Sequence, residues 1–122
     1  MRQVISTKAA PGAIGPYVQG VTLSSVTGNM IYTSGQIPLD PVSGEIPESI
    51  EAQTLRSLQN VQAIIEAAGG QVRNIIKTTV FVSDLNDFAA VNRVYNAFFT
   101  EHDAMYPARY CGEVARIPQQ AR

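Results

Sequence analysis

At 122 residues the chain is expected to form one domain, and a hydrophobic content of 45% allows a sizeable core. Charged residues make up only 16% of the chain and the formal net charge is -1, so neither nucleic acid nor a membrane is an expected partner. One cysteine and one histidine exclude an internal disulfide and leave too few ligands for a Cys/His zinc site. No apolar run reaches the roughly 18 residues of a membrane span, and the expected location is the cytoplasm.

The N-terminal third is expected to form short strands. Extended segments are predicted at residues 4–6, 17–23 and 30–33, and Thr27-Gly28-Asn29 suits a hairpin turn between the last two. The segment 38–47 is too rich in proline for a helix or a strand, so it predicts an ordered surface loop.

A first helix is predicted from Ser49 to Ala68, with Ser49 as N-cap and Gly69-Gly70 as its end. Residues at helical spacing form its expected buried stripe: Leu55, Leu58, Val61, Ile65 and Ala68.

A second helix is predicted from Asn86-Asp87 to Phe99, and Asn92 falls inside or beside its apolar stripe. An amide there needs partners, and it could brace a neighbouring loop or bind a ligand. The stripe itself consists of Phe88, Val91, Tyr95, Phe98 and Phe99.

Strands are also predicted at residues 75–82, between the helices, and at residues 108–117, after them. This order predicts an α+β domain in which a mixed sheet carries both helices on one face. The other face must be solvated or buried in an oligomer, and the low charge content favours the oligomer.

The last predicted strand places Arg109, Cys111 and Glu113 on one face. A guanidinium on a largely buried face needs an acceptor, which could be a protein carboxylate or the carboxylate of a ligand. Side chains two apart on a strand lie roughly 6.5 to 7 Å apart, so a structural pair between Arg109 and Glu113 is expected.

The other candidate residues also allow two interpretations each. Tyr17 could pack its ring in the hairpin or offer its hydroxyl to a ligand. Ser34-Gly35 ends a strand, where a glycine marks a bend or a close approach to a ligand. Cys111 is expected to be a small buried hydrophobic residue, and His102 is expected to be solvated.

Four blocks in order resemble the RidA (YjgF-type) family of reactive-intermediate deaminases, and its enterobacterial members most closely. The blocks are Ala10–Tyr17, Thr33–Pro38, Lys77–Phe88 and Pro107–Pro118. The resemblance implies a chorismate-mutase-like fold and a trimeric barrel with three clefts between subunits. It also implies hydrolysis of 2-iminobutanoate and 2-iminopropanoate to 2-oxo acids and ammonia without a cofactor. Pyridoxal-phosphate-dependent threonine and serine dehydratases would release these imines and their enamine tautomers.

The resemblance implies that Arg109 binds the substrate carboxylate and that Tyr17 is the second catalytic residue. The remaining positions that match the family's cleft are Ser34, Gly35, Asn92 and Cys111, and Cys111 is expected to act mainly through its backbone.

Two departures from the family pattern stand out. Residues 24–27 look like a four-residue insertion, and an even insertion leaves the strand faces unchanged. Members of the family continue into a final strand, and a glutamate of that strand helps position the attacking water. Residues 119–122 do not match that strand. Either the natural protein is longer or the chain diverges there. Glu113 could partly replace that glutamate. Two other functions are alternatives to the deaminase. The first is a trimeric module that binds small carboxylates or acts like a chaperone, without turnover. The second is an RNA-directed activity, which the net charge does not support.

Overall fold

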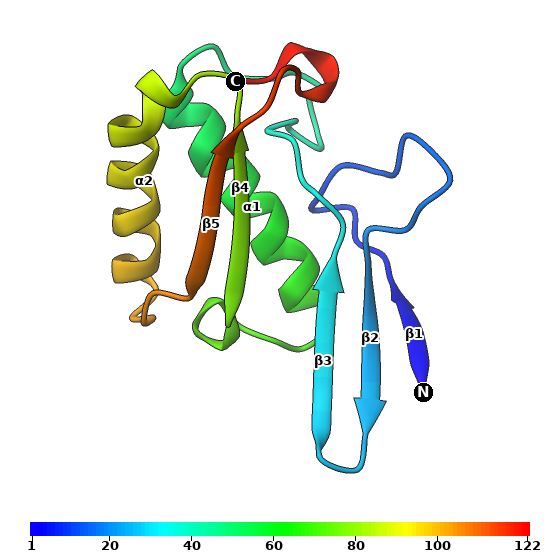
Figure 1. The fold of residues 1–122 in the computed structure, drawn as a ribbon. Coiled ribbons are helices and arrows are strands. Elements are labelled where there is room, and N and C mark those ends of the chain that lie inside the picture. The colour runs from blue at the N-terminus through cyan, green and yellow to red at the C-terminus, as the bar shows by residue number, and fades with distance from the viewer.

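The computed structural model describes residues 1–122 and contains five strands and two α-helices (Figure 1). The elements are β1 (Arg2–Ile5), β2 (Gly20–Ser25), β3 (Gly28–Thr33), α1 (Ile50–Ala67), β4 (Lys77–Val82), α2 (Phe88–Glu101) and β5 (Ala108–Glu113), with 3-10 turns at Val72–Asn74, Leu85–Asp87 and Pro118–Gln120. The predicted order is confirmed. One boundary matters for the site: β2 begins at Gly20, so Tyr17 lies in the preceding loop and not in the sheet.

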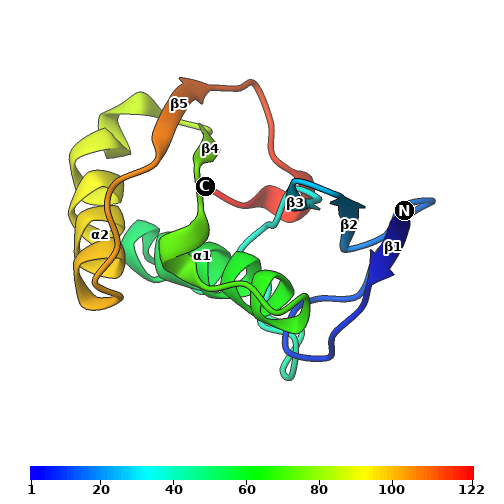
Figure 2. The same cartoon turned by 90° about the horizontal axis from the view of Figure 1, so that it is seen from below.

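The strands form two hydrogen-bonded groups. β1, β2 and β3 pair antiparallel in that order, whereas β4 and β5 pair parallel. A parallel pair needs a long crossover, and α2 supplies it between β4 and β5. Both helices lie on the same side of the strands, as predicted (Figure 2). The chain therefore combines antiparallel and parallel pairing under one helical layer.

Helix α1 begins and ends where expected. The Ser49 hydroxyl accepts a hydrogen bond from the Ala52 N–H at 3.1 Å, and Gly69 has a φ of +88°, which glycine adopts without strain. The predicted buried stripe is only partly right, because Leu55 is 40% exposed whereas Asn60 and Ile64 are fully buried.

The buried amide of Asn60 explains why the apolar pattern misplaced the stripe. Its Nδ2 donates to the carbonyls of Ile37 and Leu39 at 3.1 and 2.9 Å, and its Oδ1 accepts from Arg56 Nε. Gln53 likewise donates to the Pro47 carbonyl at 2.8 Å. Two polar side chains of α1 thus hold the proline-rich loop, which has no regular structure, as predicted.

The largest core cluster joins α2 to the turn at Val72–Asn74. It consists of Val72, Tyr95, Phe98 and Phe99, and the Tyr95 and Phe99 ring centroids lie 4.7 Å apart. Burial of such side chains stabilises the fold by about 1.5–3 kcal/mol each. Phe88, which was predicted to share this stripe, is 40% exposed at the start of the helix.

The prediction that His102 is solvated is wrong, because its ring packs and bonds inside the molecule. Its ring lies 4.4 Å from the Phe98 ring, and its Nδ1 lies 2.6 Å from the Phe98 carbonyl oxygen. A carbonyl only accepts, so Nδ1 donates and Nε2 accepts from the Gln62 amide at 3.1 Å. His102 therefore ties the end of α2 to α1.

The strands bury one face and expose the other. Ile5 and Gly20 face α1, and a Cβ added at Gly20 would lie 3.0 Å from the Ile64 side chain. The opposite side, which we call the outer face, carries half-exposed or exposed apolar side chains: Val4, Leu23, Met30, Tyr32, Phe81 and Tyr110. Neither helix combines the length and the apolar composition that crossing a bilayer requires.

Candidate active site

Arg109 projects from β5 toward α2. Its guanidinium carbon lies 4.8 Å from the centroid of the Tyr95 ring and 5.6 Å from that of the Phe88 ring. The two aromatic residues are two turns apart on α2, so both rings belong to one side of the helix. Arg109 is half-buried, and its charge is stabilised by ring faces.

No carboxylate of the chain pairs with Arg109. The two ion pairs are Arg93–Glu51 at 3.4 Å and Arg122–Asp87 at 3.3 Å. A structural salt bridge at Arg109, one of the two interpretations of the sequence, is therefore wrong.

The expected pair between Arg109 and Glu113 is wrong as well. Glu113 Oε1 accepts a hydrogen bond from the Leu85 N–H at 2.9 Å, because the first N–H groups of the short turn at Leu85–Asp87 have no partner within that turn. The carboxylate thus holds the connection between β4 and α2.

Asn92 and Cys111 lie on the elements that present Arg109. Asn92 is one turn from Phe88 and belongs to the same side of α2, and it is half-buried. Cys111 shares the face of Arg109 on β5, and its thiol is free and half-buried, so it is less buried than predicted. Together the arginine half-site consists of Thr78, Phe88, Asn92, Tyr95, Arg109 and Cys111.

Tyr17 belongs to a different region. Its hydroxyl accepts from the Ile14 N–H at 3.2 Å and its side chain is exposed, so its ring does not pack in the hairpin. Tyr17 and Gly35 line the same small hollow. No atom lies within 4 Å of a Cβ built at Gly35, so the backbone there is open to approach.

Ser34 uses its polar groups to fix this hollow. Its Oγ donates to the Val18 carbonyl at 2.6 Å, and its N–H donates to the Gln19 carbonyl at 2.8 Å. Its hydroxyl proton is therefore already committed to the backbone, whereas the oxygen can still accept.

Gln19 is a residue that the sequence did not single out. Its Oε1 accepts from the Thr7 N–H at 2.7 Å, and its Nε2 contacts the carbonyls of Thr7, Ala10 and Pro11 at 2.9, 3.2 and 2.8 Å. One buried amide thus organises the glycine- and proline-rich loop. The only signal in the sequence was an amide side chain close to the glycine- and proline-rich loop. We define the loop half-site as Tyr17, Gln19, Ser34 and Gly35.

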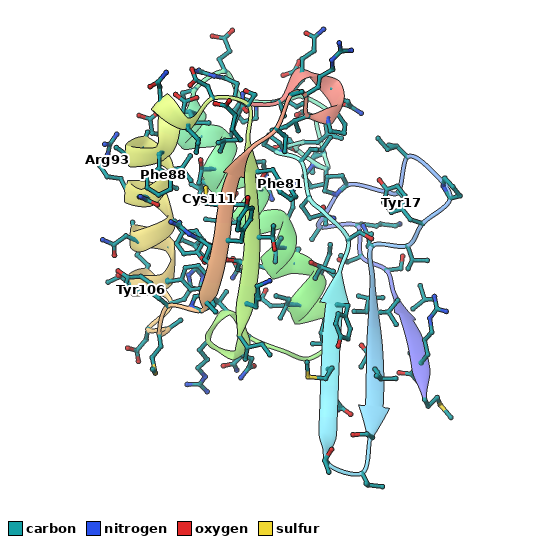
Figure 3. All side chains as sticks on the ribbon, in the orientation of Figure 1. Tyr17, Phe81, Phe88, Arg93, Tyr106 and Cys111 are labelled. Carbon is teal, nitrogen blue, oxygen red and sulfur yellow. The ribbon has the colours of Figure 1, made fainter.

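The two half-sites lie on opposite sides of the chain. Figure 3 shows Tyr17 on the loop that precedes β2, far from Phe88 on α2 and Cys111 on β5. The structure therefore brings Arg109, Asn92 and Cys111 together, and separately Tyr17, Ser34 and Gly35. A single chain does not join the two groups.

Asp40 lies in the proline-rich loop and has a lowered pKa. The Ser43 and Val42 N–H groups donate to Asp40, and they lower the pKa of its carboxyl below the usual 3.8. Asp40 follows Leu39, which lines the hollow. No group of three or more His, Cys, Asp or Glu side chains gathers as around a metal ion.

Comparison with known proteins identifies the family. A protein-family model described as Endoribonuclease L-PSP matches residues 7–122. The chain belongs to the endoribonuclease L-PSP family. The predicted resemblance to RidA proteins is confirmed by an L-PSP relative from Escherichia coli K12, named 2-iminobutanoate/2-iminopropanoate deaminase. That protein is 61% identical over 122 residues, which is 100% of this chain and 92% of the relative.

Solved structures of L-PSP relatives confirm the predicted fold. E. coli TdcF with bound serine superposes with a TM-score of 0.94 and is 56% identical, over 98% of this chain and 91% of that chain. The E. coli YjgF gene product superposes with a TM-score of 0.91 at 58% identity, with the same coverage. The α+β arrangement is thus that of the L-PSP family.

Proposed function

We propose that this chain is a 2-iminobutanoate/2-iminopropanoate deaminase in which Arg109 holds the substrate carboxylate. The observation that carries the proposal is a half-buried guanidinium that lies against two aromatic rings and has no carboxylate of its own chain. An arginine in this state can take a ligand carboxylate with two parallel hydrogen bonds. The 61% identical relative named for this activity supports the same assignment.

The reaction needs positioning more than strong acid or base chemistry. A water oxygen adds to the C=N carbon, the nitrogen takes a proton, and the resulting carbinolamine expels ammonia to leave the 2-oxo acid. An enamine must first be protonated at its β-carbon. We assign the carboxylate to Arg109, a hydrogen bond at the mouth of the cleft to Tyr17, and further polar contacts to Asn92, to Ser34-Gly35 and to the backbone of Cys111.

We further propose a homotrimer in which each cleft joins the arginine half-site of one subunit to the loop half-site of the next. Two features support it: the half-sites lie apart in one chain, and the outer face exposes apolar side chains such as Val4 at 60% and Tyr32 at 58%. Pyridoxal-phosphate-dependent dehydratases of threonine and serine would supply the substrates.

A module that binds small carboxylates without turnover is the second candidate. The structure of TdcF with bound serine favours it, because serine carries a carboxylate and is not an imine. Turnover separates the two functions, whereas binding does not.

The test generates 2-iminobutanoate with a threonine dehydratase and traps surviving imine with semicarbazide. We expect the wild-type protein to lower the trapped product, and Arg109→Ala to lose about 100-fold or more in kcat/KM while remaining folded. Arg93→Ala is the matched control, because Arg93 is a surface arginine with a side chain 67% exposed. If the wild type leaves the imine untouched, the deaminase proposal is wrong, and calorimetry with serine then tests the binding module.

The family description also names an endoribonuclease. A net charge of -1 offers little electrostatic attraction for RNA, so we expect no RNA cleavage. Cleavage of a labelled RNA that survives Arg109→Ala and repurification would contradict this expectation.

A further inference from the structure

The surroundings of Arg109 hold its side chain before any ligand arrives. A cation over a ring face is attracted by the ring quadrupole, and Arg109 has two such faces within 6 Å of its guanidinium carbon. Ring faces do not use the N–H groups in the guanidinium plane. The two aromatic residues therefore restrict the arginine without occupying its hydrogen-bond donors.

Tyr95 is itself fixed from two directions. It is 6% exposed and its ring packs against Phe99. Its hydroxyl lies 2.6 Å from the Thr78 hydroxyl, and Thr78 is the Cα partner of Arg109 in the ladder between β4 and β5. Three contacts thus form a closed circuit. The strand ladder joins Arg109 on β5 to Thr78 on β4, and the two hydroxyls join Thr78 to Tyr95 on α2. The cation–π contact then joins Tyr95 back to Arg109.

Phe88 is the second ring beside Arg109, and its surroundings differ from those of Tyr95. It is 40% exposed at the first position of α2 and is absent from the buried part of the core. A ring that stays partly in water contributes less to folding than a fully buried one. The Phe88 ring does contact Arg109, whose guanidinium carbon lies 5.6 Å from the ring centroid.

We propose that Phe88 and Tyr95 are positioning residues for Arg109, with Thr78 holding Tyr95 in place. The inference rests on the proposed function, because it gives a reason for an arginine held ready with free donors. Ordering of a long side chain before binding removes an entropic cost from ligand capture. Phe88 and Tyr95 act through Arg109 and not on the substrate.

Three substitutions separate the parts of this arrangement. Phe88→Leu keeps apolar bulk but removes the ring face, Phe88→Tyr keeps the face, and Tyr95→Phe removes only the hydroxyl that Thr78 holds. Tyr106→Phe is the matched control, because the Tyr106 hydroxyl also bonds a side chain of α2, that of Asn96, away from Arg109. Circular dichroism checks that each variant is folded.

The direct readout is the heteronuclear NOE of the Arg109 Nε–H in ¹⁵N-labelled protein, assigned by its loss in Arg109→Ala. We expect a rigid signal in the wild type, in Phe88→Tyr and in Tyr106→Phe, and a reduced NOE in Phe88→Leu. Tyr95→Phe should fall between them. The KM for 2-iminobutanoate should rise about five- to tenfold in Phe88→Leu with kcat within about twofold, because the loss is in capture of the carboxylate.

The two readouts keep this inference apart from the proposed function. An unchanged Arg109 NOE in folded Phe88→Leu and Tyr95→Phe overturns the positioning role, even if the protein is an active deaminase. If the NOE falls in Phe88→Leu but the wild-type protein hydrolyses no imine, the positioning role is supported and the deaminase proposal is wrong.

Discussion

The two half-sites are built in different ways. The arginine half-site stands on β4, β5 and α2, where a strand ladder, a hydroxyl pair and two ring faces fix Arg109. The loop half-site stands on irregular chain, where one buried amide, that of Gln19, bonds four backbone groups. Arg109, the group proposed to bind the substrate carboxylate, is held by regular structure, whereas the groups proposed for the mouth of the cleft depend on the single side chain of Gln19.

The largest expected effect comes from joining the half-sites across subunits. Arg109→Ala should inactivate one half-site, and Gly35→Trp should block the other, because the space beside Gly35 is open to a bulky side chain. Each variant alone should lose about 100-fold in activity. After the two are unfolded and refolded together at equal amounts, about one quarter of the clefts of random trimers combine two intact halves.

The semicarbazide assay on that mixture measures the recovery. Co-refolded samples of each variant with itself are the controls. If the mixture stays as inactive as its parents, the half-sites of different chains do not meet, and the comparison between them has no bearing on catalysis.

A second variant tests whether the loop half-site depends on one residue. Gln19→Leu removes the amide and leaves the Thr7 N–H and three carbonyls without their partner, so the free energy of unfolding should fall by about 2–4 kcal/mol. Urea denaturation measures it, with Gln3→Leu at an exposed position as control. The NOE of Arg109 should stay unchanged, and a parallel loss there would show that the half-sites are not independent.

The smallest effect concerns Asp40, beside the hollow. Its folded pKa is lowered by the Ser43 and Val42 N–H groups, so its stabilising contribution is complete above the ordinary value of 3.8 and is lost as the pH falls through the lowered pKa. Asp40→Asn should therefore have a lower Tm than the wild type at pH 7, and the difference should shrink in more acidic solution. A difference in Tm that does not change with pH would contradict the role of ionised Asp40.

The order of elements could be predicted because it depends on local signals. Ser49 caps α1 as expected, Gly69 ends it, and the stripe of α2 correctly contained Val91, Tyr95, Phe98 and Phe99. These features follow from side-chain periodicity and from backbone conformations that few residues adopt.

The buried amides and the partners of Arg109 could not be predicted in the same way. Asn60 and Gln19 are buried because distant carbonyls meet them, and apolarity carries no sign of that. Periodicity placed Arg109 on one face of its strand but did not say that Phe88 and Tyr95 lie opposite. That pairing depends on how α2 crosses β5, which is a property of the tertiary structure.

The outer face has a consequence for the protein in dilute solution. In the proposed trimer the half-exposed apolar side chains of β1 to β5 are covered only while subunits meet, so assembly and folding are linked by mass action. Thermal stability then rises with protein concentration. Dilution that separates the subunits of the proposed trimer also separates the two half-sites of each cleft, so activity per subunit falls. The specific activity of the proposed trimer thus depends on protein concentration.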